Sequence, residues 1–177
     1  MHTVLKKALP LLLLCGFVGI AVSVPNFGAP SVRAQELRDS DISAHLGDLM
    51  NESMQVHHTK LWLAGHANNW PLAAFELRKI KETIEQLKEA IVTIQSKSAK
   101  WQRFPVGEML NGFDSRLAAT SKAVNEKDAS KFEASYGQLT AACNACHVRA
   151  GEPQIKIIVP TGNGPFANQD FSPAGAH

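Results

Sequence analysis

The residues with the clearest chemical pattern stand near the C-terminal end of the chain, in Cys143-Asn144-Ala145-Cys146-His147. This is C-x-x-C-H, the attachment signature of c-type haem. Two thiols about one helical turn apart point the same way and can add to the two vinyl groups of one porphyrin, while the next residue brings an imidazole under the iron. A disulfide would leave His147 without a role, and a zinc site needs a second pair of ligands. The motif therefore predicts one covalently bound haem c.

The first 34 residues have the order of a secretory signal peptide. Lys6 and Lys7 precede an apolar run over residues 8–24, and a site of small residues follows that ends at Ala34. We expect cleavage after Ala34, which would also remove Cys15. An uncleaved membrane anchor is the alternative, because the apolar run approaches the ~17 to 25 residues that span a bilayer. The sequence therefore predicts export to the periplasm, with no membrane attachment after cleavage.

The composition of the remaining chain narrows the classes of function. The 177 residues are 45% apolar and 19% charged, which is enough for one globular domain with a core. Without residues 1–34 the chain has 15 basic and 16 acidic side chains, so it is close to neutral. A nucleic-acid-binding protein would show clustered basic residues, so we expect no nucleic-acid partner. The two remaining cysteines, in a compartment that oxidises idle thiols, both belong to the haem motif.

Four stretches with apolar residues at steps of three and four predict an all-α fold. They cover residues 39–64, 70–94, 110–124 and 132–146. Gly65 and the polar residues after it predict the end of the first helix, while Asn69 and Pro71 predict the start of the second. Because the connections are short, we expect residues 35–150 to form an antiparallel four-helix bundle.

Residues 151–177 form a tail of different composition, rich in Gly, Pro and Asn. Gly151 and Pro153 predict the end of the fourth helix. The tail is either disordered or laid over the helices through four apolar side chains, namely Ile157, Ile158, Phe166 and Phe171.

A helical chain of this size with C-x-x-C-H at the end of its last helix resembles the class II c-type cytochromes, the cytochrome c′ and cytochrome c-556 group. The resemblance lies in the motif, its position and the helix pattern of residues 40–149, and the tail lies outside it. It implies that Cys143 and Cys146 hold the haem and that His147 is the proximal iron ligand. In that group a residue of the first helix covers the opposite face of the haem, and a Met there makes the iron six-coordinate. It also suggests a homodimer through the first two helices.

The first helix offers four candidates for the distal side. At about 100° per residue from Ile42, the apolar stripe centres near 30°, with His57 near 60° and Met50 near 80°. Met54, near 120°, lies at the edge of the stripe and His58, near 160°, points further out. A histidine on the inward face needs hydrogen bonds or a metal. We therefore expect His57 or His58 as distal ligand, with Met50 and Met54 as weaker candidates because a buried Met usually only fills the core.

The leading functional hypothesis is a periplasmic electron carrier with one haem that works with redox partner proteins. The class II resemblance permits a second hypothesis, the binding or sensing of small gases such as NO and CO at an open or displaceable distal site. A third is a peroxidase-like activity with a distal histidine as acid and base. The chain carries no phosphate-binding loop or nucleophile elbow, so we expect no other enzyme activity.

Overall fold

The computed structural model describes residues 44–96, 99–102 and 105–174. Within these ranges every regular element is helical, and no strand is present. None of the helices in this part of the chain carries an apolar stretch long enough to cross a bilayer. The predicted signal segment, residues 1–34, and Ile42 lie outside the described residues.

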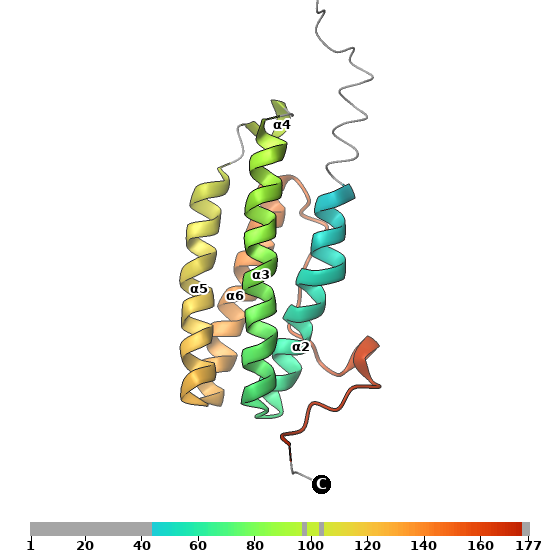
Figure 1. Cartoon of the computed structure of the whole chain (residues 1–177), viewed down its shortest axis with the longest axis vertical. Coiled ribbons are helices and arrows are strands. Elements are labelled where there is room, and N and C mark those ends of the chain that lie inside the picture. Colours follow the sequence, from blue (N-terminus) through green and yellow to red (C-terminus); the bar gives the residue numbers. More distant parts are fainter. Residues whose placement is uncertain (1–43, 97–98, 103–104, 175–177) are drawn as a thin grey trace, which may run out of the picture. The chain divides into compact units, whose positions relative to one another are not determined.

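Four long helical stretches lie side by side, and successive stretches run in opposite directions (Figure 1). The first consists of helical residues 44–48, the π-helix η1 (Leu49–Met54) and α2 (Gln55–His66). The others are α3 (Trp70–Gln95), α5 (Val106–Glu126) and α6 (Ala129–Ala150), and the short α4 (Ala99–Gln102) follows α3. Contacts join α2 to α3, α3 to α5, α5 to α6 and α6 to α2.

The core between these helices contains the predicted apolar stripes of α3, α5 and α6, while the first helix buries a face that differs from the predicted one. Its fully buried side chains come from all four long stretches and include Leu61, Ile80, Phe132 and Tyr136, with Leu117 of α5 close to full burial. Apolar area removed from water stabilises a fold by roughly 25 cal/mol per Å². The shared core therefore holds α6, which carries C-x-x-C-H, against the first helical stretch.

Local signals at two helix ends confirm the sequence predictions, and a third cap, at Asp128, was not predicted. Asn69 caps α3, since its Oδ1 accepts a hydrogen bond from the Leu72 N–H at 3.2 Å, and Pro71 stands in the first turn. Asp128 caps α6 by accepting from the Lys131 N–H at 3.0 Å. At the end of α6, Gly151 has a φ of 85°, a left-handed conformation that glycine adopts without a side-chain clash.

The first helix ends in the polar stretch after Gly65, as predicted, but Gly65 itself is still helical. The helix continues to His66, and the chain turns at Asn68, whose φ is 59°. Gly65 is buried, and a Cβ atom there would collide with the Phe132 ring of α6. A glycine at this position therefore permits the close approach of α2 to α6, which is a packing role that the helix pattern alone does not reveal.

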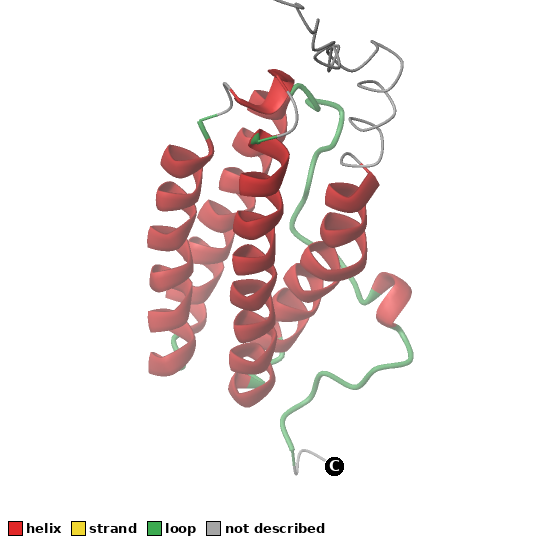
Figure 2. Ribbon diagram, turned by 45° about the horizontal axis from the view of Figure 1, so that its top comes forward, coloured by secondary structure: helices red, strands yellow, loops and turns green. Residues whose placement is uncertain are grey.

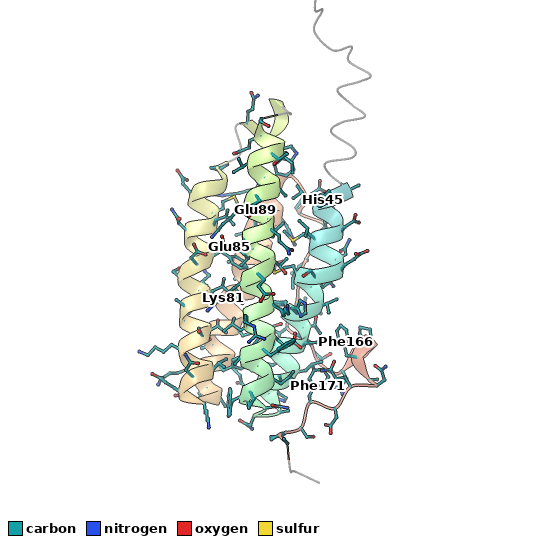
Figure 3. The ribbon with its side chains drawn as sticks, viewed as in Figure 1. His45, Lys81, Glu85, Glu89, Phe166 and Phe171 are labelled. Atoms are coloured by element: carbon teal, nitrogen blue, oxygen red, sulfur yellow. The ribbon has the colours of Figure 1, made fainter. Side chains whose placement is uncertain are left out.

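The described part of the tail lies against the helices. From the end of α6 it runs back along α2 to the short 3-10 helix η2 (Gly164–Phe166), as Figures 1 and 2 show. Phe171 is 6% exposed and belongs to the core, and Phe166 packs against it (Figure 3). Ile157 is half-buried, but Ile158 is 67% exposed. Of the two alternatives for the tail, the structure has the packed one, with Ile158 as the exception.

The contact between Gly65 and Phe132 predicts opposite effects of two glycine substitutions. Gly65→Ala should lower the free energy of unfolding by about 1–3 kcal/mol, because the buried Phe132 ring must move. Gly137→Ala, also inside a helix, should raise it by about 0.5–1 kcal/mol, since no atom outside its helix lies within 4 Å of the new Cβ. Urea denaturation of both variants measures the difference. Equal effects of the two substitutions would contradict the packing role.

Candidate haem-attachment site

The last two turns of α6 carry the whole C-x-x-C-H motif. Cys143 and Cys146 are both half-buried free thiols, and they stand three residues apart on the helix. Tyr136, Thr140 and Cys143 follow each other at steps of four and three, so they share the inner face of α6. This places Cys143 next to the core and Cys146 one turn further toward the helix end, as the predicted attachment of one porphyrin requires.

The electrostatic surroundings of the two thiols differ from those of a catalytic cysteine pair. Burial, with Cys146 as a smaller second cause, raises the pKa of Cys143 to about 12, and burial also raises the pKa of Cys146. Reactive C-x-x-C pairs have lowered thiol pKa values, typically because they lie at a helix N-terminus. Here the pair lies at a helix C-terminus, where the helix dipole disfavours a thiolate. Burial and the helix dipole therefore both favour the protonated thiols here.

The imidazole of His147 has one nitrogen fixed. Its Nδ1 lies 2.8 Å from the backbone carbonyl oxygen of Ile155 in the tail. Because a carbonyl only accepts, Nδ1 carries the proton and donates this bond. The lone pair of the neutral ring is then on Nε2, the nitrogen that an iron ligand needs. The donor set of Cys143, Cys146 and His147 therefore fits a haem c.

His58 lies in a buried network between α2 and α6. Its Nδ1 is 2.9 Å from the Tyr136 hydroxyl, and its Nε2 is 3.1 Å from the Thr140 hydroxyl. The Tyr136 hydroxyl is also 3.0 Å from the His58 carbonyl oxygen, and the Thr140 hydroxyl is 2.9 Å from the Tyr136 carbonyl oxygen. The His58 and Tyr136 rings stack with centroids 4.5 Å apart. Sequence reasoning did not identify Tyr136 or Thr140 as partners.

A neutral His58 satisfies this network in either tautomer. With the proton on Nδ1, the ring donates to Tyr136, Tyr136 donates to the His58 carbonyl and Thr140 donates to Nε2. With the proton on Nε2, the ring donates to Thr140, Thr140 donates to the Tyr136 carbonyl and Tyr136 donates to Nδ1. Both ring nitrogens have partners in each case, so His58 has no lone pair to spare for iron in this arrangement.

The predicted positions of His58 and Met54 on the first helix are wrong. Both are buried, at 3% and 7% exposure, although the count from Ile42 placed them outside the stripe and at its edge. The π-helix η1 explains the error, because its wider turn inserts about one residue and rotates everything after it by about 100°. The buried face could have been recognised from a different set of residues at steps of four, three and four, namely Met54, His58, Leu61 and Gly65.

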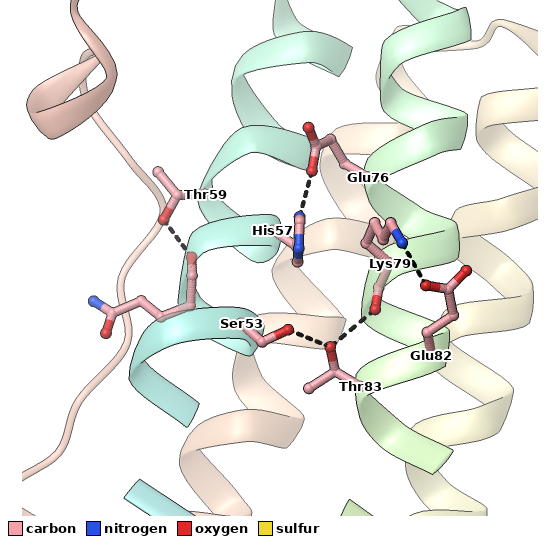
Figure 4. A network of polar contacts seen from close by, with 8 residues as sticks. Ser53, His57, Thr59, Glu76, Lys79, Glu82 and Thr83 are labelled. Atoms are coloured by element: carbon pink, nitrogen blue, oxygen red, sulfur yellow. Dashed lines mark hydrogen bonds and ion pairs between the residues drawn. The ribbon is translucent and has the colours of Figure 1, made fainter. Parts of the chain in front are cut away.

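His57 faces α3 instead of the C-x-x-C-H helix. Its Nδ1 lies 2.7 Å from Oε2 of Glu76, a carboxylate whose side chain is 3% exposed (Figure 4). One turn earlier, the Ser53 hydroxyl lies 2.6 Å from the Thr83 hydroxyl, which donates to the Lys79 carbonyl. These contacts attach the first helix to α3 and hold the His57 ring at the Glu76 level.

The two methionines lie on the part of the first helix that points toward the C-x-x-C-H end of α6. The first helix and α6 run in opposite directions, and His58 contacts the α6 turn between Tyr136 and Thr140. Met54 and Met50 precede His58 in the first helix, while Cys143 and Cys146 follow Thr140 in α6. Met54 is buried and Met50 is half-buried.

Two further observations concern possible ligand and metal sites in the described residues. A groove of about 460 Å³ lies between the first helix and α3, with His45 on one side and Glu89 on the other (Figure 3). Among the described residues, no group of three or more His, Cys, Asp or Glu side chains is placed to hold a metal ion.

Comparisons of the chain with protein-family models, curated proteins and solved structures found no match. The interpretation of the site therefore depends on its own residues.

The burial of His58 predicts a pH dependence of stability. Desolvation lowers its pKa from 6.5 to about 4, so the folded protein keeps the ring neutral where the unfolded chain takes up a proton. The free energy of unfolding should therefore fall by about 3 kcal/mol as the pH drops from about 6.5 to about 4, with no contribution from His58 above that range. Urea denaturation of wild type and His58→Gln across this range measures the difference.

The exposed His45 offers the matched control. His45→Gln should keep the wild-type pH dependence, whereas His58→Gln should show a shallower fall. A fall of equal size in all three proteins would mean that His58 is protonated in the folded state.

Proposed function

We propose that this protein is a periplasmic monohaem c-type cytochrome that acts in electron transfer. The observation that carries the proposal is the geometry of His147 on the C-x-x-C-H turn of α6, with Nδ1 donating to Ile155 and Nε2 left for iron. In the proposal the four long helices form an antiparallel four-helix bundle, as the resemblance to class II cytochromes implies, and residues 1–34 direct export. The alternating directions of the four long helices and the ring of contacts between them support this architecture.

Each residue of the site has a defined task in this proposal. Cys143 and Cys146 hold the cofactor through thioether bonds, and His147 binds the iron through Nε2. When bound, the haem supplies one-electron exchange between ferric and ferrous iron. The buried network of His58, Tyr136 and Thr140 keeps polar groups paired one turn from Cys143, so that no unpaired donor is left beside the cofactor.

For the sixth iron ligand, the contacts favour Met50 and Met54 over His57 and His58. Both nitrogens of His58 have protein partners, and His57 is bonded to Glu76 of α3. The methionines lie on the part of the first helix that points toward the cysteines, and their thioethers have no competing hydrogen bond of comparable strength. A methionine ligand would keep the iron six-coordinate and would give a higher reduction potential than a second histidine.

Absorption and EPR spectra of the purified protein test this function. We expect low-spin iron whose spectrum does not change with CO or NO. Replacing the true sixth ligand by Ala should convert the iron to a high-spin form that binds both gases, and we expect this for Met54→Ala or Met50→Ala. His57→Ala and His58→Ala should leave the iron low-spin.

Two results would contradict parts of this proposal. High-spin iron in the wild-type protein that binds CO would favour a gas-binding function instead of electron transfer. Conversion to high spin by His57→Ala or His58→Ala alone would identify a histidine as the ligand and would require the described hydrogen bonds to break.

A further inference from the structure

Three hydrogen bonds join the C-terminal tail to the C-x-x-C-H motif. His147 Nδ1 donates to the carbonyl oxygen of Ile155 at 2.8 Å. The side-chain amide of Asn144 donates to the carbonyl oxygen of Ile157 at 2.9 Å, and its Oδ1 accepts from the N–H of the same residue at 2.7 Å. Asn144 therefore uses both polar atoms of its side chain to bind both backbone groups of one tail residue.

The turn after α6 brings the tail back to this position. Gly151 adopts a φ of 85°, its N–H donates to the Val148 carbonyl at 3.2 Å, and the Glu152 N–H donates to the His147 carbonyl at 2.8 Å. This is the Schellman pattern of hydrogen bonds at a helix end. A second turn follows, in which the Ile155 N–H donates to the Glu152 carbonyl at 3.1 Å. The chain thus reverses direction within four residues.

The spacing of the two α6 side chains matches the spacing of the two tail residues that they bind. Asn144 and His147 are three residues apart on a helix, where side chains start about 5–6 Å from each other. Ile155 and Ile157 are two residues apart, which corresponds to about 6.6 Å in an extended chain. Two neighbouring positions on α6 can therefore bind alternate residues of the tail without distortion of either segment.

The tail is also fixed further along the chain. The Lys60 ammonium lies 5.0 Å from the centre of the Phe166 ring, and the side-chain amide of Asn69 donates to the Ser172 carbonyl at 2.7 Å. Phe171, the neighbour of Ser172, is buried in the core. The segment around Ile155 is therefore held between the end of α6 on one side and contacts with α2 and the turn before α3 on the other.

We infer that the tail segment Ile155–Ile157 positions the proximal imidazole and tunes its strength as a ligand, with Asn144 as the positioning residue. This inference rests on the proposed function. A donor bond from Nδ1–H to a carbonyl fixes the tautomer and orientation of the ring and makes Nε2 more basic. A more basic ligand stabilises ferric over ferrous iron, so the contact lowers the reduction potential.

Asn144→Ala tests the inference in the full exported chain, with Asn125→Ala, an exposed position on α5, as the matched control. The haem content of each protein is measured first, by pyridine haemochrome, and should be equal in all of them because the cysteines and His147 are intact. Hydrogen exchange of the Ile157 amide should be about tenfold or more faster in Asn144→Ala, since its acceptor is gone. The reduction potential should rise in Asn144→Ala and stay at the wild-type value in Asn125→Ala.

Asn144→Asp provides a conservative comparison. It keeps the acceptor for the Ile157 N–H but loses the donor to the Ile157 carbonyl, so its exchange rate should lie between those of wild type and Asn144→Ala. Its potential is not compared, because the new carboxylate charge lowers it directly. Faster exchange at Ile157 in Asn144→Ala with an unchanged potential would overturn the inference, because the tail would then be released without effect on His147. A wild-type protein without haem would overturn the proposed function instead, and the haemochrome assay would show this before any variant is compared.

Discussion

The contact between α2 and α6 is the constraint on which the rest of this structure depends. His58 reaches across it to Tyr136 and Thr140, and Gly65 lets the Phe132 ring approach the α2 backbone. A buried imidazole with both nitrogens paired tolerates little sliding, because a displaced ring would leave polar atoms unsatisfied in the core. This contact therefore fixes the level of the first helix relative to α6 and decides which of its residues stand opposite C-x-x-C-H.

The periodicity of apolar residues was sufficient to predict the helices but not the face of the first one. The caps at Asn69 and Asp128 and the stop at Gly151 act through their own neighbours, so they can be read locally. A π-helix depends on how the whole helix packs, so its presence cannot be read from local residue types. The wider turn of η1 shifts the residues after it around the helix axis by about one residue's angle. His58 was therefore expected to point outward, although it forms the centre of the polar network.

The link between the tail and the motif was equally hidden in the sequence. Asn144 stands at one of the two variable positions of C-x-x-C-H, and its partners are the backbone groups of Ile157. A backbone carbonyl, such as that of Ile155, has no residue type that marks it as a partner. The apolar residues Phe166 and Phe171 showed that the tail could pack, but only the fold shows that this packing carries the chain past His147.

A porphyrin bound through thioether bonds at the end of α6, as we propose, would add its mass to the polypeptide recovered after export, and intact-mass spectrometry measures this. We expect the mass of the chain from Gln35 onward plus one haem, and loss of the added mass when Cys143 and Cys146 are both replaced by Ser. A polypeptide without the added mass, or a haem that acid and organic solvent extract from the wild-type protein, would contradict this proposal.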